Sequence, residues 1–138
     1  MIVGRGEQTM PQGVGLETVS ESRVILAGAR DLDPGEAEAV ASSALIHAER
    51  VTALLNMELP EGPLYVHFDA DVLDPGAAPA MSYPAPGGPD AATLRRVFQH
   101  LAETGRVVAA SMSTWAPELD EDGQSRAVAM ALLSELVT

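Results

Sequence analysis

Apolar, strand-like segments alternate along this chain with segments of helical periodicity, and this alternation constrains the fold more than any other feature. The strand-like segments are RVILAGARD (23–31), PLYVHFDA (63–70) and RVVAASMSTW (106–115). The helical segments that follow them span residues 33–56, 89–105 and 124–137. Strands that alternate with helices are typical of βαβ units. We therefore expect an α/β fold in which three strands form a parallel sheet.

Residues that start and stop helices mark the ends of two of these segments. Asp33 precedes Pro34, and Glu36 adds an acidic side chain in the first turn, which predicts that a helix starts at this point. Asp90 is the candidate N-cap of the next helix, and Gly105 is its candidate stop.

The first 22 residues differ from the rest of the chain. They include GRGEQTMPQGVGLETVSES, which has several glycines and little periodicity. We expect an irregular segment over residues 1–22 and the folded α/β unit over residues 23–138. Three strands also make a small sheet for this architecture, in which five or six are usual, so we expect the unit to be part of a larger domain.

Composition argues against several classes of function. With 138 residues, 46% of them apolar and 20% charged, the chain has the composition of one globular domain. Its net charge is −12, so we expect no nucleic acid as a partner. No apolar run approaches the roughly 18 residues that cross a membrane, so we expect no membrane partner. The lack of cysteine and of a secretory pattern favours a cytoplasmic location.

Three aspartates crowd the end of the middle strand-like segment, in HFDADVLDPG. Side chains alternate along a strand, so Asp69 and Asp71 share a face with His67. Crowded carboxylates repel each other unless a cation lies between them, and hard oxygen ligands suit Mg, Mn or Ca. Ligand sites of open parallel sheets lie at the carboxyl ends of the strands. The pattern predicts a metal site with Asp69 and Asp71 as ligands, although two carboxylates are an incomplete set.

Plainer interpretations compete for the neighbouring residues. Asp74 precedes Pro75, which is typical of a turn residue that bonds to the following backbone. His67 is either a ligand or a histidine that is hydrogen-bonded inside its strand. The acidic run at residues 120–123 is most simply a solvated turn before the last helix.

The stretch HFDADVLDPGAAPAMSYPAPGG resembles the late signature of the arginase/agmatinase (ureohydrolase) family. That signature is roughly Ser-Phe-Asp-x-Asp-x-x-Asp-Pro, then a proline, then Pro-x-x-Gly-Gly. The matching residues are Phe68, Asp69, Asp71, Asp74, Pro75, Pro79, Gly87 and Gly88. AGARD before the stretch and TWAPELD after it resemble further pieces of the family in the same order. The resemblance runs from about Arg23 to the C-terminus.

The resemblance implies a three-layer α/β/α fold around a parallel sheet, with residues 23–138 as the C-terminal half of the domain. It implies two manganese ions bridged by hydroxide, which attacks the carbon of a small guanidino or amidine substrate and breaks a C–N bond. Asp69 and Asp71 would be the metal ligands of this half, while the resemblance assigns no further catalytic residue here. It also implies a homo-oligomer, or pairing with a missing N-terminal half.

Departures from the family pattern are as informative as the match. The Gly-Gly-Asp-His and Asp-Ala-His-x-Asp motifs, which carry the other ligands in the family, do not occur in this sequence. The serine before Phe-Asp is His67, and the acidic residue that grips the guanidinium falls on Thr114. A neutral hydroxyl cannot form the bidentate charged pair that a guanidinium prefers. His67 and Thr114 are therefore candidate substrate-binding positions of unusual type.

Two other functions stay open. The missing ligands, together with His67 and Thr114, are compatible with a non-catalytic arginase-fold scaffold or interaction subunit. An exposed strand edge would suit such a role, because it invites pairing with another chain. A different hard-metal hydrolase could instead use His67, Asp69 and Asp71 as its own site.

Overall fold

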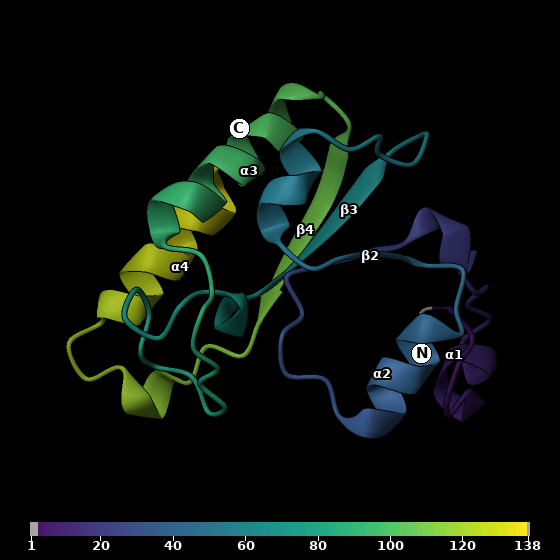
Figure 1. The fold of residues 1–138 in the computed structure, drawn as a ribbon, viewed down its shortest axis with the longest axis horizontal. Helices are drawn as coiled ribbons and strands as arrows, with labels where there is room; N and C mark the ends of the chain where they lie inside the picture. Colours follow the sequence, from purple (N-terminus) through teal and green to yellow (C-terminus); the bar gives the residue numbers. More distant parts are fainter. Residues whose placement is uncertain (1–2, 138) are drawn as a thin grey trace.

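The computed structural model, which describes residues 3–137, contains two pairs of parallel strands (Figure 1). β1 (Ile25–Ala27) pairs with β2 (Ile46–Ala48), and β3 (Leu64–Asp69) pairs with β4 (Val107–Ser113). Within residues 3–137 no ladder of hydrogen bonds joins the two pairs. The α/β fold with parallel strands is confirmed, but two two-stranded sheets replace the single three-stranded sheet that we expected.

The single helix predicted over residues 33–56 is wrong. That range contains α2 (Pro34–Ala41), the strand β2 and a 3-10 helix (Val51–Leu55). The hydroxyls of Ser42 and Ser43 donate to main-chain carbonyl oxygens one turn back, which closes the end of α2. The chain then extends to pair with β1. A three-residue strand that depends on a partner leaves little trace in the spacing of apolar residues.

The bounds of α3 (Ala91–Glu103) and α4 (Gln124–Ser134) are close to those predicted. The N-terminal segment, which we expected to be irregular, contains a short helix α1 (Thr9–Gly13). Asp33 and Glu36 form a capping box at the start of α2. The carboxylate of Asp90 accepts a hydrogen bond from the amide of Thr93 at 2.7 Å. Both caps are therefore confirmed, whereas the division of the chain at residue 22 stays a prediction.

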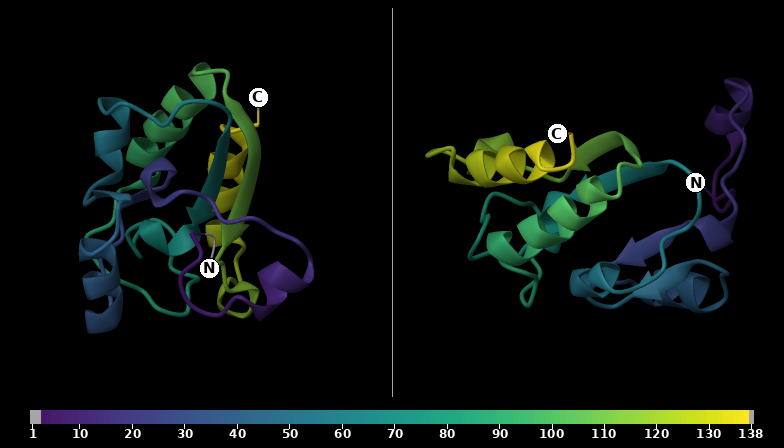
Figure 2. Two further views of the ribbon diagram at one scale, coloured as in Figure 1. Left: turned by 90° about the vertical axis from the view of Figure 1, so that its right-hand side faces the viewer. Right: turned by 90° about the horizontal axis from the view of Figure 1, so that it is seen from above.

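Helices α3 and α4 pack with the β3–β4 pair and form the main core, while α1, α2 and β2 lie on the other side of the molecule (Figures 1 and 2). The most deeply buried side chains of this core include Phe68, Leu73, Leu94, Val97 and Leu132. The ring of Phe68 meets that of Phe98 edge-on, with the centroids 5.2 Å apart. Because side chains alternate along β3, burial of Phe68 turns Tyr65, His67 and Asp69 toward the opposite, more open face.

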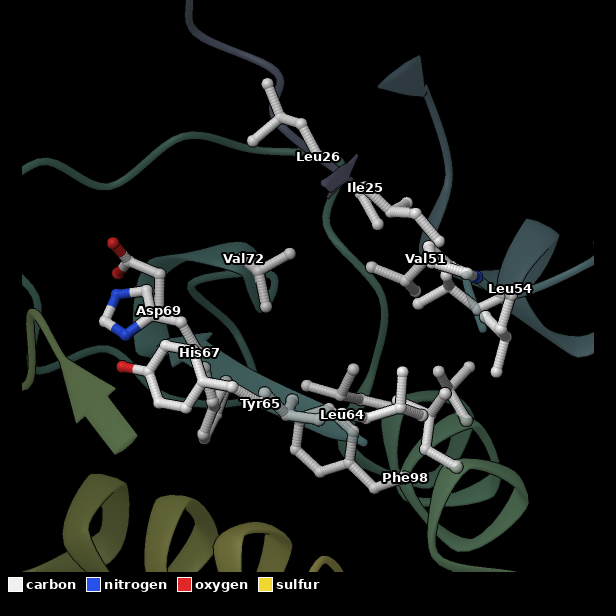
Figure 3. A pocket seen from close by; sticks show the side chains of 18 of the residues that line it. Ile25, Leu26, Val51, Leu54, Leu64, Tyr65, His67, Asp69, Val72 and Phe98 are labelled. Carbon is white, nitrogen blue, oxygen red and sulfur yellow. The ribbon is translucent and has the colours of Figure 1, made fainter. Parts of the chain in front are cut away.

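An apolar cavity of about 370 Å³ separates the strand β1 from β3 (Figure 3). Ile25 and Leu26 line one side of it, and Leu64 and Phe98 line the other. Because β4 occupies one edge of β3, the cavity lies along the edge that has no strand partner in residues 3–137. Among the described helices, none has the length and apolar character of a membrane span.

Candidate functional site

The two carboxylates predicted as metal ligands lie at the C-terminal end of β3. Asp69 is the last residue of the strand, and Asp71 lies in the 3-10 helix (Ala70–Val72) that follows it. The Asp69 carboxylate caps this turn, since its Oδ1 lies 3.4 Å from the amide nitrogen of Asp71. Asp71 is thus in a turn and not in the extended strand, but the turn keeps its carboxyl beside that of Asp69.

The environment of Asp71 disfavours a second negative charge. Burial, followed by the hydrogen bond to Asp69 and repulsion from its charge, raises the pKa of Asp71 from 3.8 to about 6. A cation between the two carboxylates would relieve this repulsion. Within residues 3–137 no group of three or more His, Cys, Asp or Glu side chains is arranged to hold a metal. The donors therefore fit a hard metal ion in type, but they form only part of a ligand set.

The raised pKa of Asp71 has a consequence for stability in the absence of metal. Between pH 3.8 and about 6 the folded chain binds more protons than the unfolded chain, so it loses stability as the pH rises through this range. Asp71→Asn removes the loss and is expected to stabilise the metal-free protein by about 1 kcal/mol near neutral pH, after allowance for solvent screening. Urea unfolding with a chelator should show this advantage growing between about pH 4 and about pH 6.5. If the stability advantage of Asp71→Asn were the same at both pH values, the raised pKa would not belong to Asp71.

Arg30 is the cation beside this pair, and sequence reasoning did not single it out. Together with Asp69 and Asp71 it lines a cavity of about 270 Å³. Its guanidinium donates to the carbonyl oxygens of Val72 at 2.6 Å, Ala85 at 2.8 Å and Asp71 at 3.0 Å. Arg30 therefore fixes the backbone of the site, and its charge offsets only part of the repulsion at Asp71. The one available signal was its place after a strand, in AGARD.

Asp74 is a turn residue, as predicted. Its carboxylate accepts from the amides of Gly76 and Gly87, each at 3.0 Å. These two hydrogen bonds hold the pKa of Asp74 below its ordinary value. The bond from Gly87 links the loop after β3 to the glycine pair Gly87–Gly88. Asp74 therefore shapes the site, and it does not face the cavity that Asp69 and Asp71 line.

His67 lies on the open face of the β3–β4 pair, in a row with Tyr65 and Asp69 (Figure 3). Its Nδ1 lies 2.7 Å from Oγ of Ser111, and its Nε2 lies 3.1 Å from Oγ of Ser113. Ser113 in turn donates to Oδ2 of Asp69 at 3.3 Å. Both ring nitrogens are thus engaged by protein groups, which favours a hydrogen-bonded strand histidine over a ligand. The two serines were missed because their contacts depend on the pairing of β3 with β4.

Thr114 follows the last residue of β4 and comes next to the same carboxylate. Its hydroxyl contacts Oδ1 of Asp69, and the amide of Asp71 donates to that hydroxyl at 3.2 Å. The structure thus brings together all four residues that the sequence singled out, His67, Asp69, Asp71 and Thr114, at the adjacent ends of two parallel strands.

The acidic run at 120–123 is more than a solvated turn. Asp120 accepts from the amides of Ser125 and Arg126 and from the indole of Trp115. Burial raises the pKa of Asp120, but these donors outweigh burial and hold it below its ordinary value. The contacts fix the start of α4 and are structural.

Comparison with known proteins agrees with this geometry. Residues 8–138 match the arginase family. The arginase of Brucella melitensis is 31% identical over 131 residues, which cover 86% of this chain and 43% of that protein. The crystal structure of Bacillus subtilis arginase superposes with a TM-score of 0.86 at 23% identity and covers 97% of this chain and 52% of that one. Trypanosoma cruzi formiminoglutamase, solved with Mn²⁺, gives a TM-score of 0.77 at 21% identity and covers 99% and 50%.

These matches differ in what they establish. The two structures share under a quarter of their residues with this chain and show the fold, which is that of arginase. The chain spans less than half the length of the Brucella relative. The family match, however, covers nearly the whole chain and includes the HFDADVLDPG stretch. The chain belongs to the arginase family.

Proposed function

We propose that this chain supplies the C-terminal half of a binuclear manganese site that hydrolyses a C–N bond of a small guanidino or amidine compound. The observation that carries the proposal is the pair Asp69 and Asp71, which converge at the end of β3 with too little positive charge to balance them. Family membership supports a hydrolase. The Mn²⁺ of the formiminoglutamase structure supports manganese as the metal.

Asp69 and Asp71 would hold the metal in this half of the site. When bound, a pair of manganese ions supplies Lewis acidity and a deprotonated water near neutral pH. Ser113 and Thr114 would orient the Asp69 carboxylate, and Arg30 would keep the loop of Asp71 in place. Because Thr114 is neutral, the guanidino or amidine group would have to be recognised by something other than a charged pair at this position.

The remaining ligands would come from polypeptide outside these 138 residues, since neither of the family's other ligand motifs occurs here. The edge of β3 that has no strand partner in residues 3–137, together with the apolar cavity beside it, offers a surface for such polypeptide. We propose that this chain acts in an assembly, either with an N-terminal half of the domain or as a homo-oligomer of the completed unit.

Manganese binding by the isolated chain tests the assignment of the two ligands. Wild-type chain is expected to bind Mn²⁺ weakly. Asp69→Asn and Asp71→Asn each remove a proposed ligand, so each is expected to weaken binding by more than the roughly tenfold that the loss of an outer-shell partner costs. Electron paramagnetic resonance of free Mn²⁺ measures the affinity. Glu58→Gln is the control, because Glu58 is an exposed acid outside the cavity that Asp69 and Asp71 line. Equal affinity in all four proteins would contradict the assignment.

A non-catalytic scaffold is the second candidate, favoured by the neutral Thr114 beside the carboxylates. Co-expression with an N-terminal half from an arginase-family protein separates the two candidates. We expect the mixture to hydrolyse at least one of arginine, agmatine, guanidinobutyrate and formiminoglutamate, with release of urea from the guanidino compounds or formamide from formiminoglutamate, and to lose this activity with Asp69→Asn. A folded, Mn²⁺-loaded complex that hydrolyses none of them would favour the scaffold.

A further inference from the structure

Thr114 has a backbone conformation that its residue type rarely adopts. Its φ is +63°, and it is the one residue other than glycine with a positive φ in the part of the chain that the structure describes. β-branched residues are genuine outliers in this region, because the branched side chain crowds the backbone. Such strain concentrates at functional sites, where the surrounding structure holds the residue in place.

The hydroxyl of Thr114 joins the two carboxylate-bearing segments. It accepts a hydrogen bond from the amide of Asp71 at 3.2 Å and contacts Oδ1 of Asp69. The carbonyl oxygen of Ser113 also lies within reach, at 2.9 Å. A threonine hydroxyl has a single proton to donate, and the bond to an ionised carboxylate is the stronger of the two. The proton therefore goes to Asp69.

The second oxygen of Asp69 is held as well. Ser113 donates to Oδ2 at 3.3 Å, and Oγ of Ser113 also lies 3.1 Å from Nε2 of His67. Each oxygen of the Asp69 carboxylate thus has a hydroxyl partner from the end of β4. Partners of this kind set the orientation of a ligating side chain before the metal arrives.

We propose that Thr114 is a positioning residue, whose hydroxyl holds the Asp69 carboxylate and the turn of Asp71 in the arrangement that receives a metal ion. The inference deepens the proposed function and rests on it for the metal. It also replaces the expectation that Thr114 contacts substrate, because its hydroxyl already donates to Asp69 and accepts from Asp71. The strained backbone is what brings this hydroxyl between the two aspartates.

Three variants of Thr114 test the inference. Thr114→Ser keeps the hydroxyl, Thr114→Val keeps the shape without it, and Thr114→Gly removes both the hydroxyl and the strain. Mn²⁺ affinity is measured by electron paramagnetic resonance, and exchange of the Asp71 amide in metal-free protein by NMR. Valine is expected to weaken Mn²⁺ binding by about tenfold or more and to speed amide exchange. Thr114→Ser is expected to keep the Mn²⁺ affinity and the amide exchange rate of the wild type.

The glycine variant separates positioning from a general effect on the fold. Glycine adopts positive φ without strain, so the melting temperature is expected to rise while Mn²⁺ affinity falls as in the valine variant. Affinity that instead follows the melting temperature would overturn the inference, as would a valine variant with wild-type affinity and amide exchange. If the wild type binds no Mn²⁺, the proposed function fails. Exchange of the Asp71 amide alone then tests whether Thr114 positions the two aspartates. Faster exchange with valine but not with serine then supports the positioning role, and unchanged exchange overturns it.

Discussion

Gly88→Ala is expected to lower the free energy of unfolding by about 3 kcal/mol, although it adds a single methyl group. A Cβ built on Gly88 would lie 2.5 Å from both the amide nitrogen of Asp74 and the carbonyl carbon of Leu73, and closer still to the carbonyl oxygen of Val72. All of these are main-chain atoms, so no side chain can rotate away to make room. The loop that follows Asp71 has to move, and Mn²⁺ affinity is expected to fall with stability.

Urea unfolding measures the effect, with Gly35→Ala as the matched control. Gly35 lies in the first turn of α2, and a Cβ there would meet nothing within 4 Å. Alanine favours a helix more than glycine does, so the control is expected to be neutral or slightly stabilising. If Gly88→Ala stayed within about 0.5 kcal/mol of the wild type, the close contact between the glycine pair and the loop after β3 would be disproved.

The sequence predicted β3 and its orientation because burial leaves a direct trace in a strand. Val66 and Phe68 alternate with Tyr65 and His67, and the structure buries the first set more than the second. The caps at Asp33 and Asp90 were predictable for a similar reason. Each depends on atoms within four residues of the cap, so local sequence contains the whole interaction.

Pairing between distant segments was not predictable in the same way. β2 has three residues, and it is a strand because β1 lies beside it, 21 residues earlier at each paired position (Ile25 with Ile46). Its sequence also fits the helical spacing that surrounds it, and this spacing predicts a helix in its place. The division into two sheets likewise depends on the distance between β1 and β3 and not on either strand alone.

In the candidate site, too, local features were predictable from the sequence and contacts between distant segments were not. Asp69 and Asp71 were predictable because a pair of aspartates at a strand end is unusual in itself. The groups that hold them come from elsewhere in the chain: Ser113 lies 44 residues after Asp69, and Arg30 lies 41 residues before Asp71. The positive φ of Thr114 was hidden altogether, because residue type argues against it.

Arg30→Met is expected to lower the free energy of unfolding by about 3 kcal/mol or more. The guanidinium donates to four main-chain carbonyl oxygens, those of Asp71, Val72, Leu73 and Ala85. Hydrogen bonds from a charged donor are each stronger than neutral ones, and methionine leaves these carbonyls without that partner. Because the charge of Arg30 also lowers the pKa of Asp71, the variant is expected to raise that pKa further.

Two further variants make this expectation specific to the geometry of Arg30. Arg23→Ala is the control, since Arg23 is exposed and its guanidinium reaches one carbonyl, that of Glu61 at 3.5 Å; we expect a change below about 0.5 kcal/mol. Arg30→Lys keeps the charge but presents three donors on one nitrogen, which cannot span carbonyls on two separate loops. The free energy of unfolding of Arg30→Lys, measured with urea, is therefore expected to lie between those of Arg30→Met and the wild type. A lysine variant as stable as the wild type would show that charge alone holds the loop, and that the fork of hydrogen bonds adds nothing.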